Sequence, residues 1–334
     1  MLLDPDDGPR RERTWWSYDD EAHAWVMREA LETRRHVLEA RTALATIRAE
    51  LPTTRDCDVD DDSAATGFEF GARVGSDLLS VVSTGGAAEA RQIHDQVLAT
   101  RLWLPLAFGG ETSHWPASVV VIEDPDRRLE FFSRHPGVPE GGAAALAELG
   151  SCWIDGRLFV SRYDTAQRVD GAVFQTVGAY LRKVYGIDQR HGWLNQSLCN
   201  YLTAKVYGTH LSFWVTTDRY GSSKGLDWTE RAPLSAGGWF ELALPLLADD
   251  RPIASFARVL TFPTQQMTWE DVVVGYAFSA YLFEGRRDDL LEIAGRFGGR
   301  EEKTAVVEDV LEMPLDAVRE RLRAWIVAMR TVQR

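Results

Sequence analysis

Cys199 and His191 are the two side chains in this sequence best suited to covalent chemistry. A cysteine thiol becomes a nucleophile when a nearby imidazole takes its proton and a third group orients that imidazole. Both residues lie in one short stretch, so a thiol–imidazole pair is one hypothesis for this region. The alternative is that Cys199 is a small apolar residue inside a packed helix.

Other groups capable of metal or phosphate chemistry lack the spacing of known sites. The seven histidines form no HxH or HxxxH pair, and the three cysteines form no CxxC pair, although paired ligands are typical of zinc sites. A zinc site built from His191 and His210 is a remaining alternative. No glycine-rich stretch matches a GxGxxG or P-loop pattern. We therefore expect no metal and no cofactor.

Two predicted helices position Cys199. The first covers roughly 170–184 and the second roughly 194–206, and the glycine-rich, charged turn 186–192 separates them. Each carries apolar residues at helical spacing, which predicts one buried face per helix. The apolar residues of the two helices are Val173, Phe174, Val177, Tyr180, Leu181, Val184, Leu194, Leu198, Tyr201 and Leu202.

The second helix resembles a segment of the gluzincin metallopeptidases. Residues 193–201 read WLNQSLCNY, which is similar to the family's WLNEGLAEY segment, whose glutamate is the third zinc ligand. The preceding helix of that family bears HExxH. The resemblance places Gln175 at the first histidine, Thr176 at the catalytic glutamate, Ala179 at the second histidine and Gln196 at the zinc-binding glutamate. It also implies a zincin-like fold.

All four of these positions carry residues that are unable to perform the family's chemistry. Positions 175 and 179 are one helical turn apart and share a face, as a two-histidine clamp requires. A neutral amide is a poor zinc ligand and a methyl group is none. Thr176 is no general base near neutral pH, and loss of the metal removes the activated water. We therefore expect no intact catalytic residue and no bound zinc.

A short strand before the helix pair is a candidate binding edge. Residues 156–163, GRLFVSRY, alternate in the manner of a strand. In active relatives an edge strand at this place pairs with an extended substrate, and an exposed edge is in general a site for strand addition. Leu158, Val160 and Trp193 are the expected cleft residues. The alternative is that other parts of the chain cover this strand.

Composition and charge restrict the partners. The chain has 334 residues and a formal net charge of −13, which disfavours nucleic acid and anionic membrane surfaces. No apolar run is long enough to span a bilayer. The N-terminus lacks the apolar core of a secretory signal. The sequence as written therefore suggests a cytoplasmic protein, or an exported one if the start codon is misplaced. It gives no oligomeric state.

The order of predicted elements suggests an α+β protein that is mostly helical, with a small mixed sheet and a helical C-terminal part. We expect five regions: a flexible tail (1–14), an N-terminal helix (15–52), an acidic linker (53–66), a zincin-like sheet-plus-helix domain (67–210) and a helical subdomain (211–334). Predicted helices at 87–103, 127–135, 268–283, 288–297, 304–311 and 315–332, and strands at 68–74 and 118–123, support this order.

These observations favour a non-catalytic pseudopeptidase that binds a peptide or a partner protein strand, or serves as a scaffold. Two alternatives stay open. One is a hydrolase with a substituted active site that uses Cys199. The other is a purely structural protein with a filled cleft.

Overall fold

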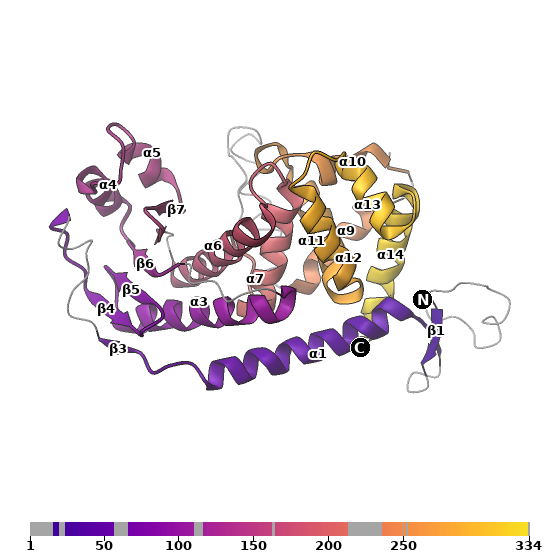
Figure 1. The fold of residues 1–334 in the computed structure, drawn as a ribbon, viewed down its shortest axis with the longest axis horizontal. Coiled ribbons are helices and arrows are strands. Elements are labelled where there is room, and N and C mark those ends of the chain that lie inside the picture. Colours follow the sequence, from indigo (N-terminus) through magenta and orange to yellow (C-terminus); the bar gives the residue numbers. More distant parts are fainter. Residues whose placement is uncertain are drawn as a thin grey trace. The chain divides into compact units, whose positions relative to one another are not determined.

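The computed structural model describes residues 16–19, 24–56, 66–109, 116–161, 164–212, 236–248, 250–251 and 253–332 (Figure 1). The chain divides into two compact units. One, the sheet unit, comprises Ala43–Val184 and Leu202–Ser212. The other, the helical unit, comprises Met1–Thr42, Tyr185–Tyr201 and Phe213–Arg334. Each unit is described by itself.

The sheet unit contains a mixed sheet of six strands with the order β3-β4-β5-β6-β8-β7. The neighbours β5, β6 and β8 are parallel, and the other pairs are antiparallel. The parallel strands are short and rich in valine, as expected for strands that are covered on both faces. The strands are β3 (Arg55–Asp56), β4 (Ala72–Gly75), β5 (Ser80–Ser83), β6 (Ser118–Val121), β7 (Ser151–Ile154) and β8 (Arg157–Val160).

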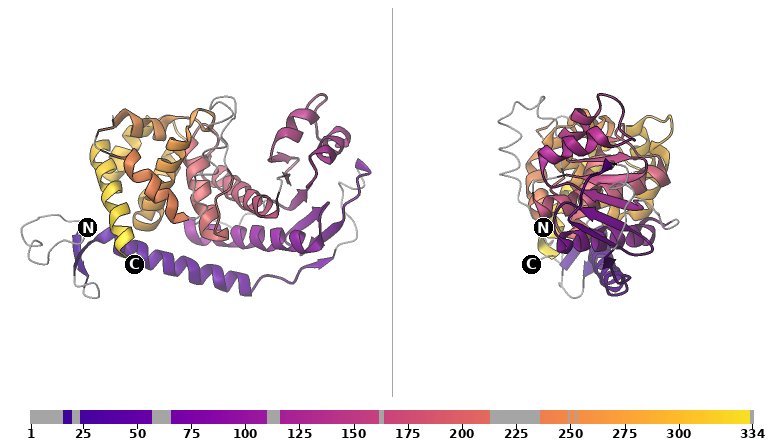
Figure 2. Two further views of the ribbon diagram at one scale, coloured as in Figure 1. Left: turned by 180° about the vertical axis from the view of Figure 1, so that it is seen from behind. Right: turned by 90° about the vertical axis from the view of Figure 1, so that its left-hand side faces the viewer.

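Helices pack on both faces of this sheet (Figures 1 and 2). Alternate side chains of a strand point to opposite faces, so Val119 and Val121 join one buried cluster and Val120 joins the other. The first cluster includes residues of α3 (Ala87–Phe108) and α6 (Thr165–Tyr185). The second includes phenylalanines of α4 (Pro125–Arg134) and borders α5 (Ala143–Glu148).

The helical unit is built around α11 (Trp269–Gly285), whose residues from Asp271 onward are all buried. A helix that is apolar on every side must lie inside the protein. Its first turn is fixed by a capping box between Thr268 and Asp271. Elements that contact α11 are η2 (Trp193–Leu198), α9 (Ala236–Leu246), α10 (Ile253–Thr261), α12 (Arg287–Phe297) and α14 (Leu315–Val332). The turn η3 (Thr264–Gln266) and α13 (Lys303–Leu311) complete the described part.

The predicted N-terminal helix is wrong in its first part. Two antiparallel strands, β1 (Trp16–Asp19) and β2 (Ala24–Met27), precede α1 (Arg28–Ala49). The segments WSYD and AWVM are rich in aromatic and branched residues that favour strands. The predicted tail at 1–14 lies outside the described residues. So does most of the predicted linker, but Arg55 and Asp56 form β3 and pair with β4.

The predicted domain boundary also differs from the observed one. Both helices of the pair are predicted to lie in one domain at 67–210. The first helix, α6, belongs to the sheet unit, but residues 185–201 belong to the helical unit. The physical reason is that Trp193 and Ser197 of η2 pack against α11. The coarse expectation of a mostly helical α+β protein with a small mixed sheet is confirmed.

Candidate functional site

Strand β7 is the last strand of the sheet among the described residues. It pairs on one side with β8 through a two-residue turn, Asp155–Gly156, in which both residues have positive φ (48° and 80°). This geometry is typical of a tight hairpin. The other side of β7 pairs with no described strand. A further strand would bond on that side, where Ser151 is 4% exposed and Trp153 is half-buried.

The register of the hairpin identifies these backbone groups. Ser161 donates to the carbonyl of Gly150 at 2.9 Å, and Cys152 lies opposite Phe159. In an antiparallel pair, alternate residues direct their N–H and C=O groups toward the partner strand. Cys152 therefore bonds to β8, and the backbone groups of Ser151 and Trp153 point away from it.

The expected edge strand at 156–163 is wrong. Strand β8 lies between β6 and β7 and is bonded on both sides. Leu158 and Val160 have no exposed surface and belong to the core beneath α3 and α6. The sequence SCWI of β7 is short and was not predicted as a strand. The Asp-Gly pair that follows it is typical of a hairpin turn and is the one signal that could have indicated this strand.

Gln175 joins helix α6 to β7. Its side-chain oxygen accepts a hydrogen bond from Trp153 Nε1 at 3.0 Å, and its nitrogen donates to Ser151 Oγ at 2.8 Å. Gln175, which the resemblance placed at a zinc-binding histidine, thus holds Ser151 and Trp153, whose backbone groups point away from β8. One amide thereby fixes the side chains of both outward-facing positions of β7.

The neighbouring positions on α6 have different surroundings. Thr176 is buried, and its hydroxyl donates to the carbonyl of Ala172 in the preceding turn at 2.7 Å. Ala179 is half-buried and presents only a methyl group. Neither side chain offers a free base or a metal ligand.

Gln196 lies on η2, a π-helical turn that joins α7 (Cys199–Tyr207). Such turns are uncommon and often occur at functional sites. Gln196 is buried, and its neighbours bind the helical unit: Asn195 donates to Thr264 Oγ1 at 3.1 Å, and Ser197 donates to the carbonyl of Val272 at 3.0 Å. Gln175 and Gln196 belong to different units, and each is described within its own unit.

Trp193 and Cys199 are core residues of the helical unit. Trp193 has no exposed surface, and its ring lies 5.2 Å from that of Phe278 and 5.8 Å from that of Phe297. Cys199 is equally buried, and its thiol lies 3.8 Å from the carbonyl of Leu194. Trp193 therefore lines no open cleft, and the Cys199 thiol is enclosed.

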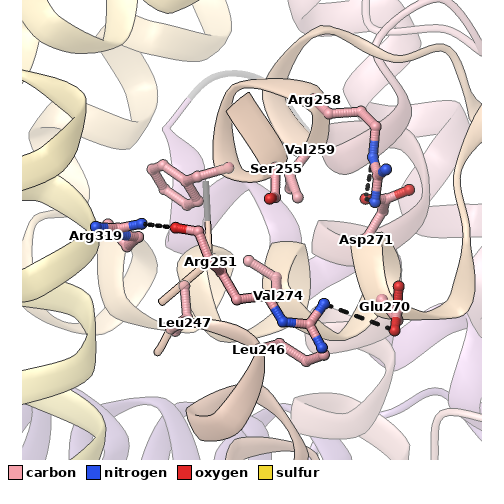
Figure 3. Close-up of a pocket in the computed structure, with 11 residues that line it drawn as sticks. Leu246, Leu247, Arg251, Ser255, Arg258, Val259, Glu270, Asp271, Val274 and Arg319 are labelled. Atoms are coloured by element: carbon pink, nitrogen blue, oxygen red, sulfur yellow. Dashed lines mark hydrogen bonds and ion pairs between the residues drawn. The ribbon is translucent and has the colours of Figure 1, made fainter. Parts of the chain in front are cut away.

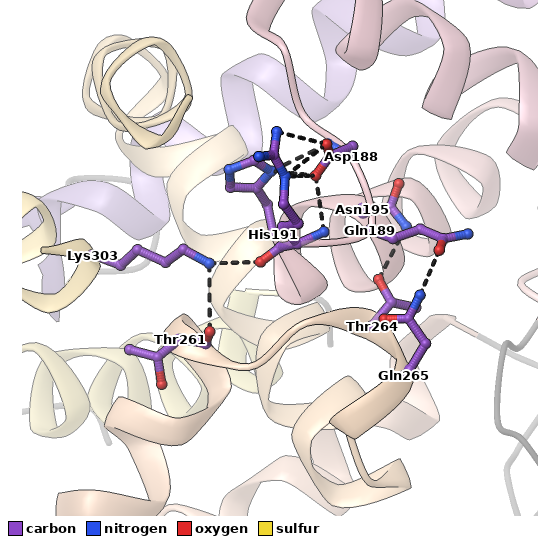
Figure 4. A network of polar contacts seen from close by, with 9 residues as sticks. Asp188, Gln189, His191, Asn195, Thr261, Thr264, Gln265 and Lys303 are labelled. Carbon is purple, nitrogen blue, oxygen red and sulfur yellow. Dashed lines mark hydrogen bonds and ion pairs between the residues drawn. The ribbon is translucent and has the colours of Figure 1, made fainter. Parts of the chain in front are cut away.

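His191 belongs to a polar network that fixes the turn before η2 (Figure 4). Its Nδ1 accepts from the backbone N–H of Asp188 at 3.2 Å. Lys303 donates to the carbonyl of Arg190 at 2.6 Å, and Thr264 N–H donates to the carbonyl of Gln189 at 2.8 Å. These contacts join residues 188–191 to two other segments of the helical unit, so the histidine has a positioning role.

Acidification is expected to weaken this network through His191. Burial lowers the pKa of the imidazole below its ordinary 6.5, and the nearby Lys303 charge adds to this effect. A base with a lowered pKa in the folded state binds protons more readily when unfolded, so its contribution to stability is lost as the pH falls below about 6.5. Denaturant unfolding at pH 7.5 and 5.5 tests this, with His191→Asn expected to lose less stability than the wild type. Equal losses would contradict the prediction.

Two pockets in the helical unit were not indicated by the sequence. One, of about 20 Å³, lies among three arginines, two acids and apolar residues (Figure 3); this is room for about one water. Its strongest feature is Arg258, which donates from Nε and Nη2 to Oδ1 of the buried Asp271 at 3.0 and 2.9 Å. The pair belongs to the capping of α11, which favours a structural role.

The second pocket, of about 370 Å³, lies between α1 and the start of α12. Glycine and charged or titratable side chains line it, with acids and arginines in equal number: Glu32, Arg35, His36, Gly285, Arg286, Arg287, Asp288 and Asp289. Small-molecule sites are usually mainly apolar with a few polar groups. The absence of an apolar wall and the balance of charge favour a solvated surface hollow.

The described residues contain no group of three or more His, Cys, Asp or Glu side chains arranged to hold a metal ion. No helix in the described part of the chain has the length and apolar character needed to cross a bilayer. No protein-family model matches the chain, and no curated protein matches it.

Proposed function

We propose that this chain is a non-catalytic, metallopeptidase-like protein that binds an extended peptide segment of a partner along β7. The observation that carries the proposal is the position of β7 at the end of the described sheet, where the backbone groups of Ser151 and Trp153 point away from β8. Backbone bonds of a strand added at a sheet edge supply affinity with little dependence on sequence.

Further features of β7 and α6 support this proposal. Gln175 holds both edge residues from the α6 side, so the edge is ordered before a peptide arrives, which reduces the entropy cost of binding. Cys152 and Ile154 anchor the opposite face of β7 in the aromatic core. The resemblance to gluzincins placed the substrate-pairing strand at 156–163, and β7 is the hairpin neighbour of that strand. The replaced positions 175, 176, 179 and 196 favour binding without hydrolysis.

Proline substitution provides a test on the edge itself. Proline lacks an N–H and is tolerated on an edge strand where that N–H faces solvent. A library of displayed 12-residue peptides is selected on the wild-type protein, and the enriched peptides are then measured on two variants. Trp153→Ala keeps the outward N–H, and Trp153→Pro removes it. We expect Trp153→Pro to bind about two- to tenfold more weakly than Trp153→Ala, the cost of roughly one hydrogen bond.

Cys152→Pro is the matched control for folding. Its N–H bonds to β8, so this substitution should destabilise the hairpin, whereas Trp153→Pro should leave thermal unfolding close to that of Trp153→Ala. Absence of any enriched peptide would contradict the proposed function. So would equal affinity of Trp153→Ala and Trp153→Pro.

A further inference from the structure

Ser76, His94 and Asp95 form a continuous chain of hydrogen bonds in the sheet unit. Ser76 lies in the turn that joins β4 to β5, and His94 and Asp95 are consecutive residues of α3. The Oγ atom of Ser76 lies 3.0 Å from Nε2 of His94, and Nδ1 of the same ring lies 2.9 Å from Oδ1 of Asp95. These are the contacts of a serine nucleophile, a histidine base and a carboxylate that orients the base.

The chemistry of the three groups fixes the direction of each hydrogen bond. A carboxylate only accepts, so Nδ1 of His94 carries the hydrogen that lies between it and Asp95. Nε2 is then an acceptor, and the hydrogen between it and Oγ belongs to the Ser76 hydroxyl. The N–H of Leu78 donates to the same Oγ at 3.3 Å, which leaves the hydroxyl hydrogen to the histidine. His94 is therefore in the tautomer that can take the proton of Ser76.

Burial holds the histidine in place and leaves the serine within reach of solvent. The His94 side chain has no exposed surface, in a helix that packs against β4 and β5. The turn is closed by the N–H of Ser76, which donates to the carbonyl of Leu79 at 2.9 Å. Ser76 is half-buried, and the side chain of Asp95 is 44% exposed. The base is thus preorganised next to a hydroxyl that a small molecule can approach.

The surroundings of Ser76 indicate the class of substrate. The backbone N–H of the residue after a serine nucleophile often donates to the oxyanion, and the corresponding residue here, Asp77, is exposed. Leu78 is 43% exposed in the same turn and offers an apolar contact. The carboxylates of Asp77 and Asp95 disfavour an anionic substrate. An uncharged ester with a short acyl chain suits these three features.

We propose that Ser76, His94 and Asp95 form an esterase site, on residues outside the positions at which the metallopeptidase chemistry is lost. The site is also separate from the peptide-binding edge, because strands β5, β6 and β8 lie between β4 and β7 in the sheet. Failure of either proposal therefore leaves the other standing.

The reaction has two steps, with water as the second substrate. Oγ of Ser76 bonds to the ester carbonyl carbon while its proton passes to Nε2 of His94. That proton leaves with the alcohol as the ester C–O bond breaks, which gives acyl-Ser76. His94 then takes a proton from water as the water oxygen bonds to the acyl carbon. The same proton returns to Oγ as the acyl–Oγ bond breaks, and the carboxylic acid is released.

A fluorophosphonate probe tests the nucleophile, because it reacts with activated serine hydroxyls. The full chain is incubated with the probe, intact mass gives the rate, and digestion locates the label. We expect one label on Ser76, and labelling at least about 100-fold slower in Asp95→Asn, because the amide favours the wrong tautomer of His94. Asp56→Asn is the control. It replaces an exposed aspartate that pairs with Arg91, one turn before Asp95 on α3, and should label like the wild type.

Hydrolysis of para-nitrophenyl acetate provides the second readout. The rate above buffer should fall at least about 100-fold in Ser76→Ala and Asp95→Asn and stay unchanged in Asp56→Asn. Absence of label on Ser76 in the wild type would overturn the inference, and this result requires no variant to fold. Labelling of Ser76 that Asp95→Asn does not slow would also overturn it, with thermal unfolding showing that this variant, changed at a partly exposed side chain, is folded.

Discussion

Replacing Trp193 with alanine is expected to lower the free energy of unfolding of the helical unit by about 3–5 kcal/mol. The ring is fully buried and packs against Phe278 of α11 and Phe297 of α12. Alanine leaves a large cavity at the point where η2 meets these two helices. Guanidinium chloride unfolding followed by circular dichroism gives the loss directly, as a lower midpoint at an unchanged slope.

Two further substitutions test whether the loss of stability comes from the buried ring of Trp193. Trp193→Phe should cost less than Trp193→Ala, because it keeps most of the ring and removes an indole N–H that is buried without a hydrogen-bond partner. Arg190→Ala, at an exposed side chain in the preceding turn, should change the stability far less than Trp193→Ala. If Trp193→Ala were as stable as Arg190→Ala, the packing of η2 on α11 would be wrong.

Replacing Arg258 with methionine is expected to lower the free energy of unfolding by about 1.5–3 kcal/mol, because the buried carboxylate of Asp271 loses the hydrogen bonds of its charged partner, whose own side chain is 36% exposed. Asp271 is 1% exposed, and its carboxylate accepts from Arg258 and from the N–H and hydroxyl of Thr268. The measurement is denaturant unfolding at pH 7. Asp271→Asn placed in the Arg258→Met background should recover part of the loss, since it removes the stranded charge.

Arg296→Met is the control for Arg258→Met. Arg296 pairs with Glu301 and Asp309, which are more than half exposed, and exposed pairs contribute about 1 kcal/mol or less. A similar cost for both arginines would show that the burial of Asp271 does not determine the effect. Comparing the two variants thus distinguishes the cost of leaving the buried Asp271 carboxylate without its arginine from the cost of losing an exposed ion pair.

The helical C-terminal part could be predicted closely from the sequence. The bounds of α14 coincide with the predicted 315–332, and α11 differs from its prediction by one or two residues. Both are long, strongly apolar patterns, and α11 also carries the Thr268 start signal. The strands were harder, because four-residue segments carry almost no periodicity. The helix α3 was predicted to end at about Trp103, before Pro105, but continues to Phe108, where Leu104, Ala107 and Phe108 are buried.

Single residues of the candidate site could be predicted from the sequence, but their contacts could not. The sequence singled out Gln175, but its hydrogen bonds to Ser151 and Trp153 depend on the register of a hairpin that was not expected. The contact of Arg168 with Glu89 was beyond the reach of sequence patterns. Glu89 and Arg168 are far apart in the chain, and only the parallel strand order brings their helices to the same end of the sheet.

The most direct test of the proposed edge is amide-resolved hydrogen exchange with and without a bound peptide from the selected library. Exchange at Ser151 and Trp153 should slow by at least about tenfold on binding, because a new hydrogen bond protects each outward N–H. Cys152 and Ile154, which face β8, should change little. Protection that appears elsewhere and leaves Ser151 and Trp153 unchanged would contradict peptide addition at β7.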